Sequence, residues 1–377
     1  MNCLYLSLIN IEKKINSGVN KKINGQIKAM ERQGLNMYRI DLKNSGLYAF
    51  NSGKEILLKE NFFSKKYEFI EKRVIYYRTI LDFVKKQNIK FIYIRYQLSD
   101  PFFIKFIRNC KKRGLKIFLE VATYPYEKEI GGLTLYIDNF FKRFLHKYID
   151  NVITYSDHKT IFGVQTIKIA NGIDLDFIKA PEYNKDSDVI NLIGVASVSK
   201  WHGFDRVIKS LAEYYNNNVN NKEVFFHIVG DGPELENLKV LTKKLNLVKY
   251  IIFHGFKSGE ELDEIFNECD IGIGSLGNHR KGIYKDSALK NREYCARGIP
   301  FIIASQDNDF PENYKYVFRV SKNENSINIR TIVEFYNSIQ QEDYTKEMRE
   351  YARVKLSWDA KMQPVIKKIL NVESYSN

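Results

Sequence analysis

Apolar strand patterns and amphipathic helix patterns alternate along almost the whole chain, and this alternation begins twice. The first run starts with the apolar stretch at 3–9, and the second starts with NLIGVAS at 191–197. A polar, charged segment at 181–188 lies between them. Such alternation is typical of parallel sheets covered by helices, which bind ligands beyond the carboxyl ends of their strands. We therefore predict an α/β fold with two Rossmann-like, doubly wound parallel-sheet domains, residues 1–180 and 188–357, facing a central cleft.

The hydrophobic periodicity also locates the individual strands and helices approximately. The expected strands lie at 3–9, 36–42, 91–96, 116–122, 151–156, 191–197, 223–230, 250–255, 270–275 and 301–304. The expected helices lie at 21–33, 67–87, 101–113, 135–149, 203–215, 234–245 and 259–268, with a further helix that ends before residue 298.

The stretch from Gly282 to Ser305 joins a glycine-containing loop, this further helix and an apolar strand. Gly298 and Pro300 end the helix, because glycine adopts the left-handed conformation after a helix and proline cannot continue one. The inner stripe of the helix is expected to consist of Ala288, Leu289, Cys295 and Ala296. Glu293 lies near the helix end among basic residues, and a lone carboxylate in that setting is usually a surface ion-pair partner.

The chain has 377 residues and a formal net charge of +14. This excess favours an anionic partner such as a phosphorylated ligand, a nucleic acid or an acidic membrane, although a lysine-rich genome composition explains it equally well. The four scattered cysteines form no C-x-x-C pair, which fits a reducing cytoplasm better than disulfides or zinc. The N-terminal apolar run lacks a preceding basic region and a cleavage site, so it indicates a strand and not a signal peptide. No apolar run has the length of a membrane span, and we expect a protein that is soluble or lies on a membrane.

Glycines stand between several expected strands and helices, where main-chain N–H groups at a helix N-terminus can bind phosphate. Tight turns also require glycine, so each loop alone is weak support. A G-x-G-x-x-G pattern occurs at 272–277, but it begins inside an expected strand and no helix follows it directly. Because a G-x-x-x-x-G-K-[ST] motif is absent as well, the sequence disfavours a dinucleotide-dependent dehydrogenase and a P-loop nucleotidase. The loop glycines are Gly18, Gly203, Gly230, Gly232 and Gly282.

A basic cluster follows the first strand of the second run and contains Lys200, His202 and Arg206. Cationic side chains at a strand-to-helix turn suit a diphosphate, and solvated surface charge is the alternative. The six histidines show no metal-ligand spacing, and no serine–histidine or cysteine–histidine pattern indicates acyl transfer. D-x-D patterns occur at 174–176 and 307–309, but so short a pattern arises easily by chance in a chain with 45 acidic residues.

Aromatic and acidic residues gather at 119–129, at or just past the end of an expected strand. Aromatic rings offer flat faces to sugars, and carboxylates accept hydrogen bonds from sugar hydroxyls. A packed loop explains the same residues equally well. The candidate acceptor-binding residues are Arg95, Glu120, Tyr124, Tyr126 and Glu127.

The second half of the chain resembles retaining glycosyltransferases of family 4 through four motifs in order: GVASVSKWHGFDRVIKSL, FHIVGDGPELENL, IIFHGF and REYCARGIPFI. The first half supports the resemblance through INSGVNKKINGQIKAMERQG, FIYIRY, LEVATYPYEKE and IANGID. The resemblance covers nearly all of 1–370, especially with bacterial members that build capsular or exopolysaccharide repeat units. It implies a GT-B fold whose C-terminal helix, 358–377, crosses back onto the first domain.

The resemblance also implies where a nucleoside diphosphate sugar binds. Glu293 would be the second carboxylate of a paired-glutamate motif and would bind the ribose hydroxyls, while Lys285 stands where the first glutamate is expected. Lys200, His202 and Glu293 are the expected catalytic residues, and Lys200, His202 or Arg206 would stabilise the departing diphosphate. No metal and no cofactor are implied. The expected donor-binding residues are Gly18, Ser197, Lys200, Gly203, Arg206, Gly232, Phe256, Gly282, Lys285, Ser287, Leu289 and Glu293.

The expected activity is the retaining transfer of a sugar from a nucleoside diphosphate donor, UDP-linked in preference to GDP-linked. The acceptor would be a glycan or lipid-linked glycan in bacterial surface polysaccharide synthesis, in the cytoplasm. The helices at 101–113 and 135–149 mix aromatic residues with cations, which suggests peripheral contact with an anionic membrane at its inner face, or ordinary packing. Nucleic acid is not an expected partner, because the basic residues form no dense run. A sugar-nucleotide epimerase and a non-catalytic partner subunit remain open, and Lys285 favours the latter.

Overall fold

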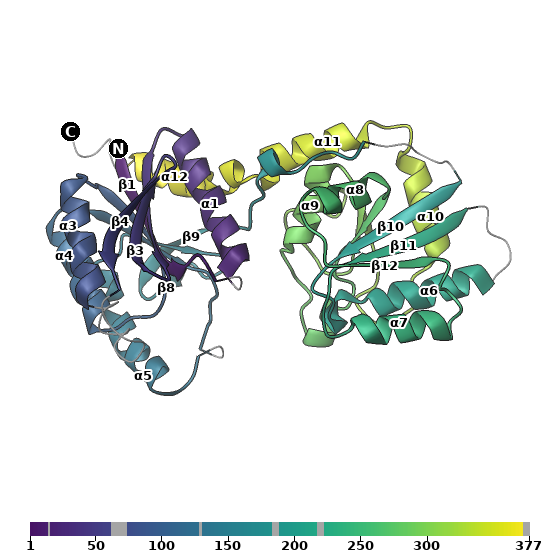
Figure 1. The fold of residues 1–377 in the computed structure, drawn as a ribbon, viewed down its shortest axis with the longest axis horizontal. Coiled ribbons are helices and arrows are strands. Elements are labelled where there is room, and N and C mark those ends of the chain that lie inside the picture. Colours follow the sequence, from purple (N-terminus) through teal and green to yellow (C-terminus); the bar gives the residue numbers. More distant parts are fainter. Residues whose placement is uncertain (14–15, 62–73, 128–129, 183–187, 217–221, 372–377) are drawn as a thin grey trace. The chain divides into compact units, whose positions relative to one another are not determined.

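The computed structural model describes residues 1–13, 16–61, 74–127, 130–182, 188–216 and 222–371. The chain forms two compact units (Figure 1). Unit 1 comprises Met1–Ala170 and Lys361–Asn377, and unit 2 comprises Asn171–Ala360. Part of the helix expected at 67–87 and most of the polar segment at 181–188 fall outside the described residues.

The described residues of unit 1 form a nine-stranded sheet in the order β4-β3-β2-β1-β5-β6-β7-β9-β8. The central strands β2, β1, β5, β6, β7 and β9 are parallel to one another. At the two sides of the sheet, β3 and β4 on one side and β8 on the other pair antiparallel. The sheet is therefore mixed, with a parallel centre as the apolar strand patterns predict. The bounds are β1 Asn2–Asn10, β2 Asn36–Lys43, β3 Gly46–Asn51, β4 Lys54–Glu60, β5 Phe91–Arg95, β6 Lys116–Val121, β7 Asn151–Thr154, β8 Thr160–Ile161 and β9 Val164–Lys168.

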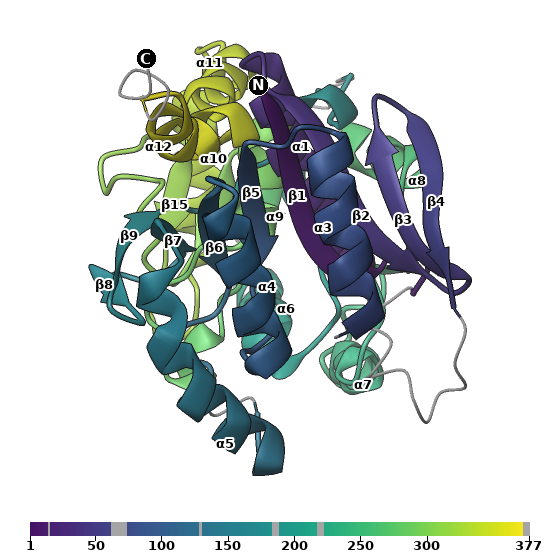
Figure 2. The ribbon, with the colours of Figure 1, turned by 90° about the vertical axis from the view of Figure 1, so that its left-hand side faces the viewer.

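Helices cover both faces of this sheet, with α3 and α4 on one face and α1 on the other (Figures 1 and 2). Side chains alternate along β1 accordingly: Leu4 and Leu6 join the core under α3 and α4, whereas Tyr5 turns to the α1 side and donates to Gln26 Oε1 (2.7 Å). The helices are α1 Ser17–Arg32, α3 Tyr76–Lys86, α4 Pro101–Lys112, α5 Gly132–Phe141, which continues as the 3-10 helix Lys142–Lys147, and α12 Trp358–Asn371.

The sequence patterns did not predict the hairpin of β3 and β4. Ser52 and Gly53 form its two-residue turn, both with positive φ (47° and 78°), between the paired residues Asn51 and Lys54. Positive φ at both central positions is the geometry that favours tight hairpins. The serine–glycine pair at the turn is the signal that would have located it.

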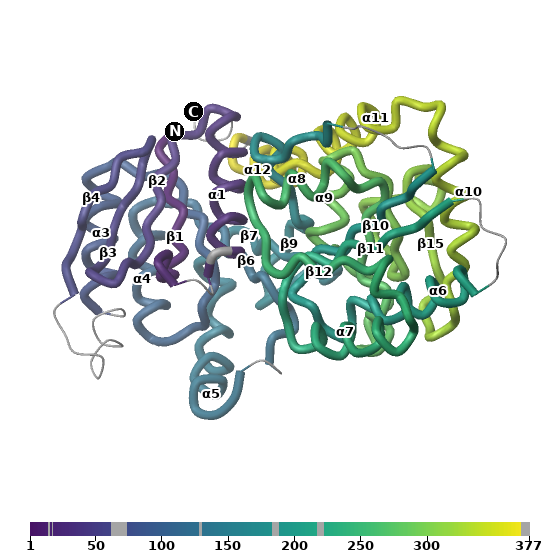
Figure 3. Tube along the Cα trace, turned by 45° about the vertical axis from the view of Figure 1, so that its right-hand side comes forward, coloured from purple at the N-terminus to yellow at the C-terminus, as the bar shows by residue number. Residues whose placement is uncertain are grey.

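In the part of unit 2 that the structure describes, six parallel strands form a sheet in the order β12-β11-β10-β13-β14-β15. Helices α6 and α7 lie on one face, and α8 and α9 lie on the other (Figures 1 and 3). The predicted doubly wound parallel architecture is confirmed for this unit. The strands are β10 Val189–Val195, β11 Glu223–Val229, β12 Ile251–Gly255, β13 Ile271–Ile273, β14 Phe301–Ile303 and β15 Val317–Arg319. The helices are α6 Phe204–Asn216, α7 Leu235–Lys244, α8 Glu260–Asn267, α9 Leu289–Arg297, α10 Ile329–Ile339 and α11 Tyr344–Tyr351.

The chain of unit 2 reverses its direction of travel across the sheet between β10 and β13. It proceeds from β10 outward to β12 and then returns to place β13 on the other side of β10. The carboxyl ends of two strands that flank such a reversal leave a crevice, which is where doubly wound sheets bind ligands. The loops after β10 and β13 are therefore the first place to look for a site.

Candidate functional site

Helix α9 starts beside this reversal and is held there by Tyr294. The Tyr294 hydroxyl donates to the carbonyl of Ile273 at the end of β13 (3.0 Å) and accepts from the N–H of Val195 at the end of β10 (3.3 Å). Its ring fills the space above Gly272, where an added Cβ would lie 2.6 Å from ring atoms. One buried tyrosine thus fixes α9 to both strands that flank the reversal.

Arg292 fixes the first turn of α9 from inside the protein. Its guanidinium is fully buried and makes two bonds to the Asp307 carboxylate (2.9 and 3.1 Å) and a further one to Asp309. It also donates to the carbonyl of Ala288, the residue before the helix (2.9 Å). The D-x-D pattern at 307–309 therefore neutralises an internal arginine.

The loops after β10 and β13 are bonded to each other through their main chains. Leu276 N–H donates to the carbonyl of His202 (2.9 Å), and Gly277 N–H donates to that of Trp201 (3.1 Å). Gly203 has a φ of 67°, and a Cβ added to it would lie 2.7 Å from the nitrogen of Gly277. Glycine at 203 is therefore required for the close approach of the two loops. This role differs from the expected one, which was contact with the nucleotide-sugar donor.

Lys200 and Arg206, two of the expected phosphate-binding residues, differ in how far a ligand could contact their side chains. Lys200 is solvated, with 72% of its side chain exposed and its Nζ 3.9 Å from Glu234. Arg206 is buried and donates to the carbonyls of Leu276 (2.6 Å) and of two further loop residues. The guanidinium of Arg206 thus holds loops in place, which corrects the expectation of direct phosphate contact.

His202 is buried and its Nδ1 accepts from the N–H of Ser199 (3.1 Å). Burial, together with the nearby charges of Lys290 and Lys281, lowers the pKa of His202 to about 3. The ring is therefore neutral at physiological pH and carries its proton on Nε2, where it can donate a hydrogen bond.

Lys290, in the first turn of α9, belongs to the candidate site and was not among the residues predicted from the sequence. Its nitrogen is shielded from solvent and has no hydrogen-bond partner within the described part of the chain. Burial lowers the pKa of Lys290 to about 7, against the opposing effect of Asp286. A cation in the first helical turn is disfavoured by the helix dipole, and this local conflict is the signal that could have identified Lys290.

Glu293 lies one turn after Lys290 on the same side of α9. Its side chain is 30% exposed, and its Oε1 accepts from Nε and Nη2 of Arg297 (3.2 and 3.0 Å). Arg297 is itself held by Asp263 (2.8 Å). The ion pair that the sequence suggested is therefore present, and it orients the carboxylate on a partly open helix face.

The other expected donor residues of unit 2 lie in loops after its strands. Ser197, Phe256, Gly282 and Lys285 are exposed, Gly232 is half-buried, and Ser287 has a buried Oγ without a partner among the described residues. The prediction that Leu289 belongs to the inner stripe of the helix is wrong, because its side chain is 55% exposed. In unit 1, Gly18 lies in the first turn of α1, where an added Cβ would meet open space.

Glu120 forms the centre of a buried network in unit 1. Its Oε2 accepts from Tyr93 (2.7 Å) and Gln26 (3.0 Å), and its Oε1 accepts from Arg95. Burial alone would raise the pKa of Glu120, but Arg95 and Lys22 hold it below its usual value. The carboxylate is fully buried, so the expectation that it accepts from sugar hydroxyls is wrong.

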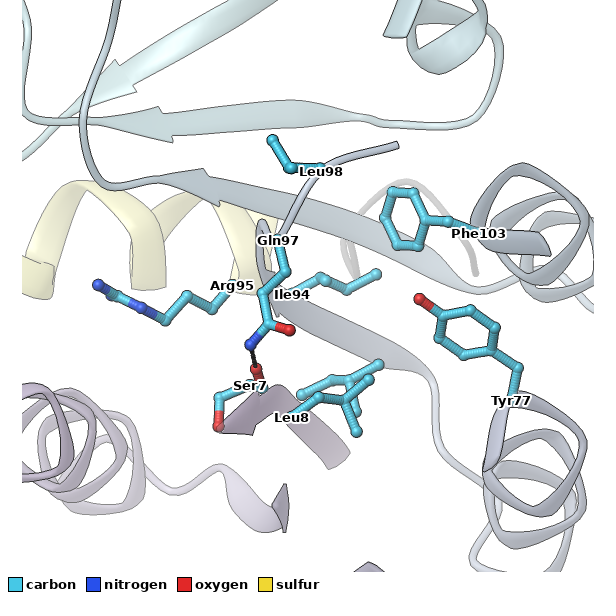
Figure 4. Close-up of a pocket in the computed structure, with 9 residues that line it drawn as sticks. Ser7, Leu8, Tyr77, Ile94, Arg95, Gln97, Leu98 and Phe103 are labelled. Carbon is cyan, nitrogen blue, oxygen red and sulfur yellow. Dashed lines mark hydrogen bonds between the residues drawn. The ribbon is translucent and has the colours of Figure 1, made fainter. Parts of the chain in front are cut away.

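The remaining expected acceptor residues are more accessible, except for Tyr126. The Tyr126 hydroxyl is buried and donates to Asp138 (2.5 Å), which places it in the packed interior. Tyr124 and Glu127 are half-buried, and Glu127 pairs with Lys142 (3.0 Å). Arg95 lines a pocket of unit 1 together with Leu6, Ser7, Leu8, Tyr77, Ile94, Gln97, Leu98 and Phe103 (Figure 4).

Comparisons with known proteins agree with this architecture. Residues 177–315 match the family model of glycosyl transferases group 1. Sucrose-phosphate synthase (tll1590) from Thermosynechococcus elongatus is similar in structure, with a TM-score of 0.62, 14% identity and 100% of both chains covered. A glycosyltransferase from Rickettsia africae ESF-5 has a TM-score of 0.62 at 15% identity, over 98% of this chain and 97% of that chain. Anabaena Alr3699/HepE in complex with UDP has a TM-score of 0.58 at 13% identity over 100% of both chains. No curated protein matches the sequence significantly.

The solved structures show the fold, since identities of 13 to 15% are too low to carry more. The group 1 match spans the loops after β10 and β13 and all of α9, which are the elements that surround the reversal between these two strands. The group 1 match and the GT-B fold together indicate a glycosyltransferase enzyme.

Proposed function

We propose that this protein is a retaining glycosyltransferase that uses a nucleoside diphosphate sugar, UDP-linked in preference to GDP-linked. The acceptor would be a glycan or lipid-linked glycan in surface polysaccharide synthesis in the cytoplasm. The observation that carries the proposal is the placement of α9, whose first turn and Glu293 lie beside the reversal between β10 and β13. That Anabaena Alr3699/HepE, with the same fold, was solved in complex with UDP supports the choice of nucleotide.

In the proposed donor complex, Glu293 accepts from the ribose hydroxyls and exposed Phe256 contacts the base. The loop from Gly282 to Ser287 faces the sugar and diphosphate. Positive charge comes from lysine side chains and from N–H groups at the start of α9, so we propose a donor site that needs no metal or cofactor.

The chemistry follows from where charge develops. As the bond from the sugar to the diphosphate oxygen breaks, negative charge grows on the leaving group, and preorganised donors nearby stabilise it. Lys200 is solvated enough to reach the leaving group, and the neutral His202 ring can donate from Nε2. Arg206 acts as a positioning residue that holds the loops. The acceptor hydroxyl forms the new bond, and we assign no enzyme nucleophile.

Calorimetric titration with UDP and a panel of UDP-sugars tests the donor site. Glu293→Ala is expected to weaken UDP binding by roughly 10- to 100-fold, because hydrogen bonds to a charged group contribute about 1.5–3 kcal/mol. Glu350→Ala, on an exposed ion pair with Arg353, is the control and should bind like the wild type. Equal affinity of the Glu293 variant and the wild type would refute the donor-site assignment.

Analysis of the products that form when the protein is incubated with each UDP-sugar separates the competing activities. Binding of several UDP-sugars without transfer or hydrolysis would favour a non-catalytic subunit, a reading that Lys285 in place of the expected carboxylate supports. Conversion of the donor sugar in the absence of any acceptor would identify an epimerase.

We further infer that α5 contacts an anionic membrane surface. Leu133, Tyr136 and Phe140 share one face of this helix and are 75%, 78% and 53% exposed. Exposed Arg143 and Lys147 follow them in the chain. Apolar and aromatic side chains next to cations suit the headgroup region of anionic lipid. Within the described residues no helix combines the length and hydropathy of a membrane span.

The expected membrane role of the helix at 101–113 is not supported, because Phe103 and Phe106 of α4 are buried in the core. Co-sedimentation with vesicles containing phosphatidylglycerol tests α5. The triple change of Leu133, Tyr136 and Phe140 to serine should abolish co-sedimentation at low salt. Phe102→Ser, at the exposed aromatic residue of α4, is the matched control and should bind normally. Absence of binding by the wild type would remove the inference.

A further inference from the structure

The nitrogen of Lys290 lies in an unusual environment for an ammonium group. Lys290 is half-buried, while its Nζ is shielded from solvent and donates to no acceptor among the described residues. The Phe204 ring lies 5.6 Å away, and the Oγ of Ser287 is a second buried polar atom without a described partner. Buried polar groups are normally hydrogen-bonded, and leaving a charged one unpaired destabilises the protein.

The titratable neighbours of Lys290 accept no hydrogen bond from its nitrogen. Asp286 lies near enough to favour the charged lysine, but its Oδ1 accepts from Ser287 N–H (2.6 Å) and its Oδ2 accepts from Asn278 Nδ2 (2.9 Å). His202 is neutral and offers only a donor at Nε2. The N–H of Asn291 donates to the carbonyl of Ala288 (3.2 Å), whereas the N–H groups of Leu289 and Lys290 belong to the first turn of α9, where an α-helix offers no intrahelical acceptor. No described residue therefore accepts a hydrogen bond from Lys290 Nζ, although Asp286 lies near enough to favour its charge.

We propose that Lys290 Nζ, Ser287 Oγ and the first N–H groups of α9 form an oxyanion site for a phosphate group of the ligand. The site is placed by Tyr294 and Arg292, which hold α9 against β10, β13 and Asp307. It rests on the proposed function in one respect, since the phosphate would belong to the nucleoside diphosphate of the donor. Lys290, and not the solvated Lys200, then supplies the main positive charge to the diphosphate.

Proton uptake is a consequence of this site. The pKa of Lys290 is about 7 in the free protein because of burial, so at pH 8 the amine is mostly neutral. A bound phosphate favours the ammonium and raises this pKa. Ligand binding at pH 8 should therefore take up to one proton, whereas at pH 6 the lysine is already charged and the uptake should be smaller.

Calorimetry with UDP and with inorganic pyrophosphate tests the site in the full-length protein. Lys290→Met should weaken both ligands by roughly 10- to 100-fold. Titration at pH 8 in buffers of different ionisation enthalpy should show proton uptake for the wild type and none for Lys290→Met. Lys239→Met, on an exposed pair with Glu236, is the control and should match the wild type in both measurements.

The outcomes separate this inference from the proposed function. If the wild type binds UDP and Lys290→Met binds it equally well, the oxyanion site is refuted and the donor assignment stands. If pyrophosphate binds through Lys290 and UDP binds no tighter, the oxyanion site stands and the nucleotide assignment falls. If the wild type binds neither ligand, both fall. Should the variant fail to fold, absence of proton uptake by the wild type at pH 8 would still overturn the inference.

Discussion

Single buried charges in this protein fall into two groups according to their partners. Arg292, Arg206 and Glu120 are buried, and each is hydrogen-bonded to carboxylates, carbonyls or donors of the protein itself. Lys290 Nζ is also buried, and no described residue satisfies it. The hydrogen-bonded charges position elements of the fold, although Arg206 Nε also has no described partner. Lys290 Nζ makes no hydrogen bond to a described residue and belongs to the first turn of α9, which makes it a candidate for ligand binding.

Arg292→Met should strongly destabilise unit 2. The change leaves Asp307 and Asp309 without their cation, and breaking a buried ion pair by removing one partner typically reduces stability by about 3–5 kcal/mol. Both tryptophans, Trp201 and Trp358, belong to unit 2, so urea unfolding followed by tryptophan fluorescence reports on this unit. Arg353→Met breaks an exposed pair and should leave the transition nearly unchanged. Equal midpoints for the two variants would contradict the structural role of Arg292.

His227 should make unit 2 sensitive to acid. Burial and the adjacent His254 lower the pKa of His227 from 6.5 to about 4. Below pH 6.5 the unfolded chain takes up a proton that the folded protein rejects, so the stabilisation present above pH 6.5 is lost as the pH falls toward 4. Between pH 6.5 and 5 this amounts to about 2 kcal/mol.

Melting temperatures at pH 7 and pH 5 test this prediction. His227→Gln should show a smaller decrease between the two pH values than the wild type, by several degrees. His146→Gln, at an exposed histidine, should keep the decrease of the wild type. A His227 variant that is as acid-sensitive as the wild type would exclude this source of pH dependence.

Residue roles were predictable from the sequence only where a motif located them. The sequence placed Glu293 among basic residues and suggested an ion pair without naming the partner, and the structure shows that this partner is Arg297. The burial of Glu120 was not predictable, because its partners Tyr93 and Gln26 come from β5 and α1, far away in sequence. Lys290 was missed because an orphaned side-chain nitrogen is a property of the packed structure.

At the scale of elements, the site depends on two loops that only glycine allows to meet. Gly203 and Gly282 both have a φ close to +68° (67° and 68°), so each disfavours a side chain by the same backbone effect. They differ in their surroundings: a Cβ at 203 would lie 2.7 Å from Gly277 N, and a Cβ at 282 would meet nothing within 4 Å. The pair therefore separates backbone strain from loop packing.

Gly203→Ala should lower the melting temperature more than Gly282→Ala. The Gly282 variant bears only the left-handed backbone penalty of about 1–2 kcal/mol. The Gly203 variant must also push apart the loops after β10 and β13, so UDP binding should weaken as well. Thermal unfolding and calorimetry of both variants measure the two effects. Equal losses in both variants would mean that the loop contact contributes nothing beyond backbone strain.

Elements were predictable where hydrophobic periodicity was strong. The expected helices at 203–215, 234–245 and 259–268 match α6, α7 and α8, and each end differs by one residue. The β3–β4 hairpin was missed, since β4 is largely exposed and its apolar residues Ile56, Leu57 and Leu58 are consecutive and do not alternate with polar ones. The helix expected at 135–149 ends as α5 at Phe141 and continues as a 3-10 helix, a difference that periodicity cannot resolve.

At the scale of the whole molecule, the chain passes between the two units twice. It leaves unit 1 after Ala170 and returns at Lys361, within α12. From Lys361 onward, α12 belongs to unit 1 and buries Met362, Val365, Ile366 and Ile369. The two-unit architecture was predictable because strand–helix alternation repeats, whereas the discontinuous composition of unit 1 depends on tertiary contacts of the tail.

The return of α12 makes the stability of unit 1 depend on the far end of the chain. Ile366→Ala should therefore destabilise unit 1 by about 2–5 kcal/mol, because the isoleucine is 1% exposed and its removal leaves a cavity. Hydrogen exchange followed by mass spectrometry should show faster exchange in peptides of Met1–Ala170, with peptides of Asn171–Ala360 unchanged. Leu370→Ala, on the same helix and 37% exposed, should have a much smaller effect. Faster exchange spread equally over both units would show that they unfold together, and the tail would then stabilise the whole chain instead of unit 1.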